Sequence, residues 1–508
     1  MEQASGAAGS ARVFTSERAY MHRVWLEGRI APQALHDETT PPVVDGGADT
    51  PNPFHQDEIG PYRRPDQRRI ATAEQDLLRQ FVGRRLLPGF LEAGAREGLR
   101  FAPCTVRAAI VTAGGTAPGT NAVIHAIVRR HYQYVAAAQA AWETRGRQGP
   151  EPKCTGHVLG IRNGFEGLMA PRASRPPAAV PGPVELHPEE TVAWREQGGC
   201  HLGLSRYDFS VEGRIEQLAQ NLIAEGVDIL YVIGGAGGMH AALQLHTALR
   251  RHQTGRNIVV AAVPKAIDND IAWMARSLGH ASALAEAARL LNVLRLDAEA
   301  NRRVILVELF GEEAGFLAAN AALVSGKADC VLIPEEPFDP WKAVDYIADR
   351  ARKRRSALVV LAEGALLALG SGLREQGLIK VPESSAATLR DPYYERQDLR
   401  DAALKWLRDE LRSQFIKPPI FTGHIIISQP GYLIRAVPPD AEDIIHAERM
   451  GDLVVDSALA GYTGFMLSLW MGYVLVPLPL VAGVRKRILP RGMVWRELVE
   501  HTGQPPLG

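Results

Sequence analysis

Two carboxylates stand two positions apart in the loop Val263-Pro-Lys-Ala-Ile-Asp-Asn-Asp-Ile271, directly after the apolar run IVVAAV. One of the pair, Asp268 or Asp270, could accept a hydroxyl proton while the other approaches a metal ion. Lys265 in the same loop suits a phosphate. The structural alternative is an Asp-rich turn that its own side chains cap. The loop therefore indicates acid–base or metal chemistry and leaves the capped turn open.

Two further loops are rich in glycine, and each lies between an apolar strand-like run and a helical stretch. They are TAGGTAPGTN, with Gly114 and Gly115, and IGGAGG, with Gly235, Gly237 and Gly238. Glycine lets a backbone approach an anion closely, and a helix N-terminus offers free N–H groups. A pair of tight turns is the alternative, but two such loops in one chain favour phosphate binding.

Neither glycine loop matches the common nucleotide motifs. No G-x-x-x-x-G-K-[ST] occurs in them, and the sixth position counted from Gly235 is His240, so G-x-G-x-x-G fails as well. A dinucleotide-dependent oxidoreductase is therefore disfavoured.

The elements that must hold these loops alternate between short β-branched runs and longer helical stretches. Strands are expected at 107–112, 158–162, 229–233, 258–263, 304–309, 330–333 and 357–362, and helices at 122–132, 214–224, 239–251 and 281–293. This alternation predicts an α/β fold with parallel sheets flanked by helices, in two lobes. Ligands bind at the carboxyl ends of such strands, where all three loops lie.

Composition limits the classes of protein. The chain has 508 residues with 57 basic and 57 acidic side chains, which argues against nucleic acid as a partner. Residues 457–484 carry no charge, but three glycines and two prolines interrupt them, so a strand and turn are favoured over a membrane span. The four cysteines form no C-x-x-C pair, and the N-terminus lacks a basic start followed by an apolar run. A cytoplasmic protein is expected.

Taken in order, the segments from about 106 to 480 resemble the phosphofructokinase family. They include AAIVTAGGTAPGTNAVI, VLGIRNGFEGL, GVDILYVIGGAGG, VPKAIDNDI, RRVILVELFGEEAGFLA, KADCVLIPEE, LAEGA and GYLIRAVPPDAEDIIHAERMG. Lys265 and the form YLIRAVPP are most similar to the long ATP-using phosphofructokinases of plants and trypanosomes.

The resemblance implies a function and a set of roles. Family members transfer a phosphoryl group, with Mg²⁺, to the 1-hydroxyl of fructose 6-phosphate, and Gly237 points to ATP as the donor more than to pyrophosphate. Asp268 matches the catalytic base, and Asp270 matches the second acid, near metal and sugar. The other matching positions bind the donor phosphates (Gly114, Gly115, Arg206, Gly235, Gly237, Gly238 and Lys265) or the sugar phosphate (Glu335, Arg303, Tyr432, Arg435 and Gly311). Arg303 would act from a neighbouring subunit, which implies a homo-oligomer, either a dimer or a tetramer.

The same resemblance divides the chain. It implies an N-terminal extension at 1–104 and a donor-binding lobe at 105–300 that is completed by about 432–480. A sugar-phosphate lobe follows at 301–431, with an insertion at 370–400 before a helix at 401–415, and then a C-terminal segment at 481–508. Within the extension, residues 71–98 have a helix-like pattern.

Four positions depart from the family pattern, and one of them is Ile426, which stands where the family has a basic residue ahead of Tyr432. Ala236 replaces the aspartate that holds Mg²⁺, Ala266 replaces a threonine, and Glu312 replaces an arginine near the reacting phosphate. Each change weakens the neutralisation of charge on which phosphoryl transfer depends, although Arg302 or another cation could pair with Glu312. Three hypotheses stay open: an active kinase, a regulatory homologue that binds nucleotide or sugar phosphate without turnover, and a kinase that uses pyrophosphate or a different sugar phosphate.

Overall fold

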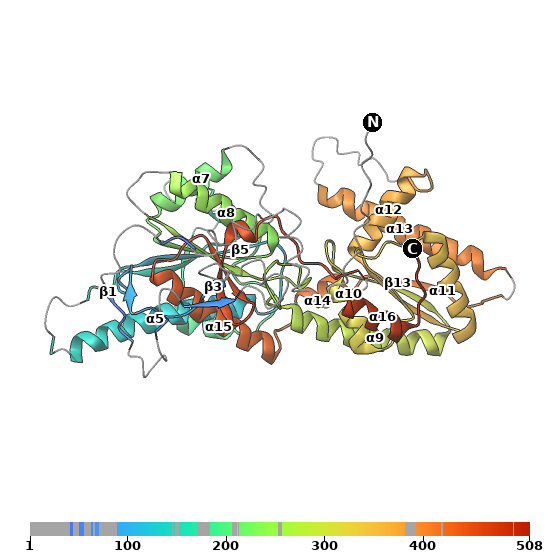
Figure 1. Cartoon of the computed structure of the whole chain (residues 1–508), viewed down its shortest axis with the longest axis horizontal. Helices are drawn as coiled ribbons and strands as arrows, with labels where there is room; N and C mark the ends of the chain where they lie inside the picture. Colours follow the sequence, from blue (N-terminus) through green and yellow to red (C-terminus); the bar gives the residue numbers. More distant parts are fainter. Residues whose placement is uncertain are drawn as a thin grey trace, which may run out of the picture.

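The computed structural model describes residues 41–43, 50–54, 62–63, 67–70, 89–144, 146–147, 152–169, 183–205, 211, 213–251, 257–380, 392–417, 420–490 and 492–508. Two lobes lie side by side along the long axis of the molecule (Figure 1). One lobe is built on a nine-stranded sheet and the other on a four-stranded sheet.

The strand order of the larger sheet is β2-β3-β15-β14-β9-β8-β5-β6-β7. In that order the strands are Arg68–Ile70, Gly89–Glu92, Tyr473–Pro477, Phe465–Leu469, Val259–Pro264, Ile229–Gly234, Arg107–Ala113, His157–Gly160 and Val184–Glu185. The strands from β14 to β6 run parallel, whereas β15, β3 and β2 on one edge and β7 on the other pair antiparallel. The predicted α/β class is confirmed, with a parallel centre and antiparallel edges. A short antiparallel pair, β1 (Thr50–Pro51) and β4 (Gly98–Leu99), stands apart from this sheet.

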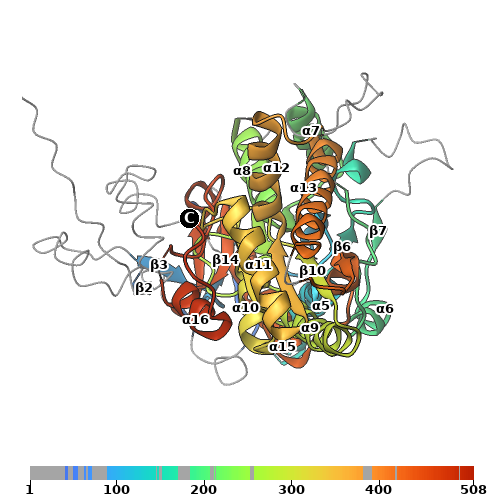
Figure 2. The same ribbon diagram turned by 90° about the vertical axis from the view of Figure 1, so that its right-hand side faces the viewer.

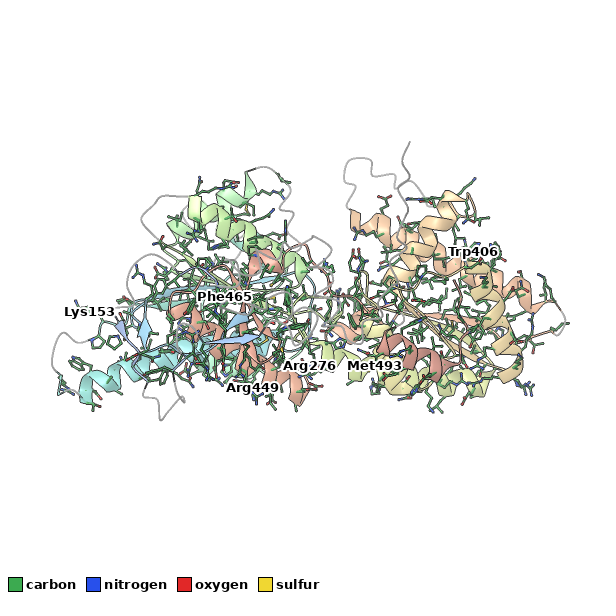
Figure 3. All side chains as sticks on the ribbon, viewed as in Figure 1. Lys153, Arg276, Trp406, Arg449, Phe465 and Met493 are labelled. Atoms are coloured by element: carbon green, nitrogen blue, oxygen red, sulfur yellow. The ribbon has the colours of Figure 1, made fainter. Side chains whose placement is uncertain are left out.

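Helices cover both faces of the larger sheet. Helices α7 (Arg214–Ala224) and α8 (Ala236–Arg251) lie on one face, and α5 (Thr120–Thr144) and α15 (Ala441–Leu459) lie on the other (Figure 1). Every residue of β8 and β9 is buried, as expected of a parallel strand covered on both faces. Phe465, which begins β14, lies inside this lobe (Figure 3).

The smaller sheet is wholly parallel, in the order β11-β12-β10-β13. Its strands are Cys330–Leu332, Ala357–Ala362, Val304–Leu309 and Ile425–Ser428. Helices α9 (His280–Asn301), α10 (Phe316–Ser325) and α16 (Met493–Thr502) pack in one core, and α11 (Pro340–Arg354), α12 (Glu363–Glu375) and α13 (Pro392–Phe415) pack in the other. Figure 2 shows this lobe end on, with α11 and α12 facing the viewer.

The chain returns from one lobe to the other after the last strand of the larger sheet. A 3₁₀ turn (Leu478–Leu480) follows β15, and Arg485 then pairs as a β-bridge with Ile271 in the acidic loop. The Lys486 N–H donates to the Asp270 carbonyl at 2.8 Å, and the Ile488 N–H donates to the Glu335 carboxylate at 3.0 Å. Residues 485–488 therefore touch the acidic loop at one end and the smaller lobe at the other.

Two local expectations need correction, and a third is confirmed. The helix-like pattern at 71–98 does not hold at its end, because residues 89–92 form β3 directly after Pro88, which a helix interior excludes; residues 71–88 lie outside the described part. Helix α13 begins at Pro392, earlier than the expected 401. Residues 457–484 form the end of α15, β14, β15 and a 3₁₀ turn, as the strand-and-turn hypothesis predicted. Among the described residues, no helix is long and apolar enough to cross a membrane.

The close approach of α5 and α15 generates a stability prediction. A Cβ placed on Gly451 of α15 would lie 2.3 Å from the Ala126 Cβ and 3.0 Å from its carbonyl carbon, so Gly451→Ala must push the two helices apart. We expect a loss of about 1–3 kcal/mol in the free energy of unfolding, measured by urea denaturation. Gly372→Ala in α12 is the matched control because a Cβ there meets open space, and it should stabilise the protein by about 0.5–1 kcal/mol. Equal effects of the two substitutions would contradict the packing argument.

Candidate active site

A cleft of about 770 Å³ lies where the larger sheet faces the smaller lobe. The loops after β5, β8 and β9 form one wall, and residues after β10, from α13, from α14 (Gly431–Arg435) and from the returning segment form the rest. This is the position at which parallel sheets bind ligands. Nine residues singled out in the sequence line it together: Gly114, Gly115, Gly235, Gly237, Gly238, Lys265, Asp268, Asp270 and Arg435.

The glycine loops leave room on their cleft side. Gly114 has a φ of +79°, which favours glycine, and neither Gly114 nor Gly237 has an atom within 4 Å of the place where a Cβ would stand. Helix α8 begins at Ala236 inside the second loop, so its first N–H groups are available there. Gly115 is tighter, because a Cβ there would lie 2.9 Å from the guanidinium carbon of Arg435.

Lys265 connects two of the loops. Its side chain is buried, and the Nζ donates to the Gly115 carbonyl. Burial, with a smaller contribution from the charge of Arg435, lowers the pKa of Lys265 to about 8. The ammonium group therefore holds the first glycine loop in place through the Gly115 carbonyl, in addition to any contact with a phosphate.

The two aspartates occupy different environments. The Asp270 carboxylate accepts a hydrogen bond of 2.6 Å from Arg485. The Oδ1 atom of Asp268 is buried without a hydrogen-bond partner. Burial, and next the charge of Asp270, raise the pKa of Asp268 to about 7, against the opposing effect of Arg435. Asp268 is therefore the carboxylate that can change protonation near neutral pH, while Asp270 is held by its cation.

The loop between these aspartates is held in a bent conformation. Asn269 has a φ of +54°, and its Oδ1 accepts the Ser277 N–H at 2.9 Å. Asparagine tolerates this left-handed conformation better than most residues. The bend sets Asp268 and Asp270 on the same side of the loop, facing the cleft.

A Mg²⁺ ion fits these carboxylates. Mg²⁺ commonly takes only one or two carboxylates from a protein and fills its other positions with phosphate oxygens and water. The carboxylate of Asp270 can supply one such ligand, beside the unpartnered Oδ1 of Asp268. Ala236 lines the same cleft and adds no ligand, and the described residues contain no cluster of three or more potential metal ligands.

Glu312 lies on the opposite wall with a cation of its own. Its carboxylate contacts the guanidinium of Arg396, the first of two arginines that α13 brings to the site. Arg302, the partner considered from the sequence, instead ends α9 with a φ of +56°. The neighbouring Glu313 pairs with Arg487 at 2.6 Å.

A second, smaller pocket of about 230 Å³ adjoins the cleft and includes Tyr432. Arg435 separates the two spaces, since its guanidinium lies 3.9 Å from the ring centroid of Phe310, which lines the smaller pocket. Two functional candidates that the sequence analysis did not single out are here, Glu363 and Arg400, which contact each other. The motif LAEGA contains Glu363 and could have identified it from the sequence. No local motif surrounds Arg400.

Three described sequence candidates line neither pocket. Glu335 accepts the Gly315 N–H at 2.9 Å and so holds the start of α10, and Arg303 donates to Asp297 at 2.8 Å. Gly311 has a φ of +131° in the turn after β10. Arg206 lies outside the described residues. Their ligand-binding roles stay predictions.

The fold and the site define a class of protein: an α/β protein with a cleft lined by two glycine loops and a pair of aspartates. The phosphofructokinase family model matches residues 151–458 of the chain. The chain is 33% identical over 431 residues to the ATP-dependent 6-phosphofructokinase of Amycolatopsis methanolica, which covers 82% of this chain and 83% of that protein. It is 29% identical over 412 residues to the ATP-dependent 6-phosphofructokinase of Trypanosoma brucei brucei, covering 81% of this chain and 75% of that protein.

Solved structures agree in fold. The pyrophosphate-dependent phosphofructokinase of Marinobacter aquaeolei matches with a TM-score of 0.56 and 19% identity, covering 79% of this chain and 92% of that one. The corresponding protein of Nitrosospira multiformis matches with a TM-score of 0.53 and 18% identity, covering 79% and 93%. The chain belongs to the phosphofructokinase family, a family of phosphotransferases.

The environment of Asp268 predicts a pH-dependent cost in stability. A carboxyl whose pKa is higher in the folded than in the unfolded protein favours folding least when it is ionised, so its cost grows as the pH rises from about 4 to about 7. We expect Asp268→Asn to stabilise the protein by about 1–2 kcal/mol at pH 8 and by less at pH 4.5, measured by urea denaturation. Asp345→Asn, on the exposed face of α11, is the control and should behave alike at both pH values. A gain for Asp268→Asn that is the same at both pH values would contradict the raised pKa.

Proposed function

We propose that this protein is a 6-phosphofructokinase that uses Mg²⁺ and ATP to phosphorylate the 1-hydroxyl of fructose 6-phosphate. The observation that carries the proposal is Asp268: a carboxylate in the cleft with an unpartnered oxygen and a pKa raised to about 7. A general base works best when its pKa lies near the working pH. The glycine loops beside it offer the anion-binding backbone that a phosphate donor requires.

Each group has a defined task in this proposal. Asp268 accepts the proton of the sugar hydroxyl as the oxygen attacks the terminal phosphorus of the donor. Arg435, between the cleft and the smaller pocket, orients the sugar phosphate and the donor relative to one another. The smaller pocket, with Tyr432 and Glu363, takes the sugar phosphate. Asp270 would hold Mg²⁺, which would neutralise charge on the donor phosphates.

ATP is the proposed donor for two reasons. Gly237 lacks the side chain that would reduce the space at the start of α8, where a Cβ would meet nothing within 4 Å. The curated relatives at 28–33% identity are named ATP-dependent. Pyrophosphate is the alternative donor. A homo-oligomer in which Arg303 reaches a neighbouring sugar site, and a cytoplasmic location, remain predictions.

The test is formation of fructose 1,6-bisphosphate at high enzyme concentration with Mg²⁺, comparing ATP with pyrophosphate. Asp268→Asn should reduce kcat by about 10²–10⁴ because the base is removed. A folded Asp268→Asn protein with undiminished turnover would refute the assigned role. Product formation with pyrophosphate alone would replace the proposed donor.

The pH dependence of that reaction is a separate prediction. Asp268 must be ionised to accept a proton, so kcat should rise as the pH increases through about 7. Glu363 contributes to the raised pKa of Asp268. Glu363→Gln should therefore move the rise in kcat to lower pH, measured with saturating substrates. A pH profile that stays in place in the Glu363→Gln enzyme would contradict the coupling of these two carboxylates.

A regulatory homologue without turnover is the second candidate. Two observations favour it: Ala236 gives the metal no carboxylate at the start of α8, and Glu312 adds negative charge to the cleft wall. If wild-type protein binds ATP but forms no product, the double variant Ala236→Asp with Glu312→Arg should gain activity. The loss of one preorganised group typically costs about 10²–10³ in rate. A double variant that binds ATP and still forms no product would count against this candidate.

A further inference from the structure

We propose that Arg396 of α13 is a donor-phosphate-binding residue and that Glu312 occupies its guanidinium when no donor is present. This inference rests on the proposed function, since it concerns the phosphate side of the same cleft. It assigns a role to a helix that carries none of the glycine or aspartate motifs.

Among the described residues, four cations line the cleft, and they differ in how tightly the protein holds them. Lys265 is buried and donates to the Gly115 carbonyl. Arg485 donates to Asp270 at 2.6 Å. Arg435 packs between Gly115 and the ring of Phe310. These three are each held by a structural contact that a ligand would have to break or share.

Arg396 differs because its side chain is 56% exposed and its contact in the cleft is to another partly exposed side chain, that of Glu312, at 37%. Exposed ion pairs contribute little to stability. A phosphate can therefore take the place of the carboxylate at small cost. Arginine suits this exchange because its planar group binds carboxylate and phosphate oxygens with the same two-point geometry.

The helix places this arginine with some precision. Four positions further along α13, on the same face, Arg400 is buried and contacts Glu363 and Glu308 at the wall of the smaller pocket. That buried contact fixes the rotation of α13 and so directs Arg396 toward the larger cleft. One helix thus presents one cation to each of the two spaces.

The arrangement also compensates for Glu312. The carboxylate on that wall repels an incoming polyphosphate, and Arg396 stands opposite it at contact distance. When a donor phosphate binds Arg396, that phosphate has a cation beside it even though residue 312 is acidic. Glu312 then acts as a competitor for the same guanidinium, which sets how tightly a donor can bind.

The test is equilibrium binding of ATP with Mg²⁺, and separately of pyrophosphate, in the absence of sugar phosphate, by isothermal titration calorimetry. Arg396→Gln should raise the Kd of both about tenfold, because one charge-assisted contact is lost. Glu312→Gln should lower the Kd about threefold to tenfold, because the competing carboxylate is removed.

The double variant separates competition from simple repulsion. If Glu312 acts through Arg396, Glu312→Gln should bring little gain in the Arg396→Gln background. An equal gain in both backgrounds would overturn the proposed exchange, as would an unchanged Kd in Arg396→Gln. Arg374→Gln is the matched control: Arg374 pairs with Glu395 at 3.4 Å beside α13, outside both pockets, and its loss should leave the Kd unchanged.

Fructose 6-phosphate binding shows whether Arg396 contacts the donor or the sugar phosphate. Its Kd should not change in Arg396→Gln; a loss confined to fructose 6-phosphate would overturn the assignment to the donor. These measurements need no turnover, so they remain decisive if the protein proves inactive. If the enzyme is active and the Kd for ATP is the same in wild type and Arg396→Gln, this inference is refuted and the proposed function is unaffected.

Discussion

The arrangement of the candidate site depends on the contact between the acidic loop (263–271) and the returning segment (485–488). Arg485 and Lys486 bind the side chain and backbone of Asp270, and two residues later Ile488 binds Glu335 in the smaller lobe. This short stretch therefore fixes the position of the acidic loop relative to both sheets. Arg276, next to the loop, lies at the junction of the lobes (Figure 3) and contacts Glu442 at the start of α15. Because hydrogen bonds prefer a narrow range of distances and angles, these contacts hold the Asp270 end of the acidic loop in place.

Most of the fold could be predicted from the sequence because short runs of neighbouring residues indicate the strands and helices. Strand positions follow from runs of β-branched residues that end in glycine or aspartate, and these predicted β5, β8, β9 and β10 closely. The α/β class and the loops at the carboxyl ends followed from the same pattern. The end of the 71–98 segment was wrong because a proline stands before residues that also suit a strand. Apolar content alone does not separate a buried strand from a helix.

Only part of the site could be predicted from the sequence, because many of its residues come from distant parts of the chain. The glycine loops and aspartates carry their own motifs. The partners Arg396 and Arg485 lie 84 and 215 positions from Glu312 and Asp270, in segments whose residue types are common on any surface. Only packing brings them to the cleft. Glu335 shows the converse, since a carboxylate in a family-like segment serves two backbone N–H groups away from the cleft.

The distribution of charge in the cleft bears on the changes at 236 and 312. Among the described residues, four cations and four acids line the cleft, and the acids Asp270, Glu312 and Glu313 each contact an arginine. Asp268 is the acid whose inward oxygen has no partner, and its pKa therefore responds most to what enters the cleft. A neighbouring anion raises that pKa and a cation lowers it. Burial is the main cause of the raised pKa of Asp268 and the charge of Asp270 is the next, so a ligand that enters the cleft shifts this pKa from about 7.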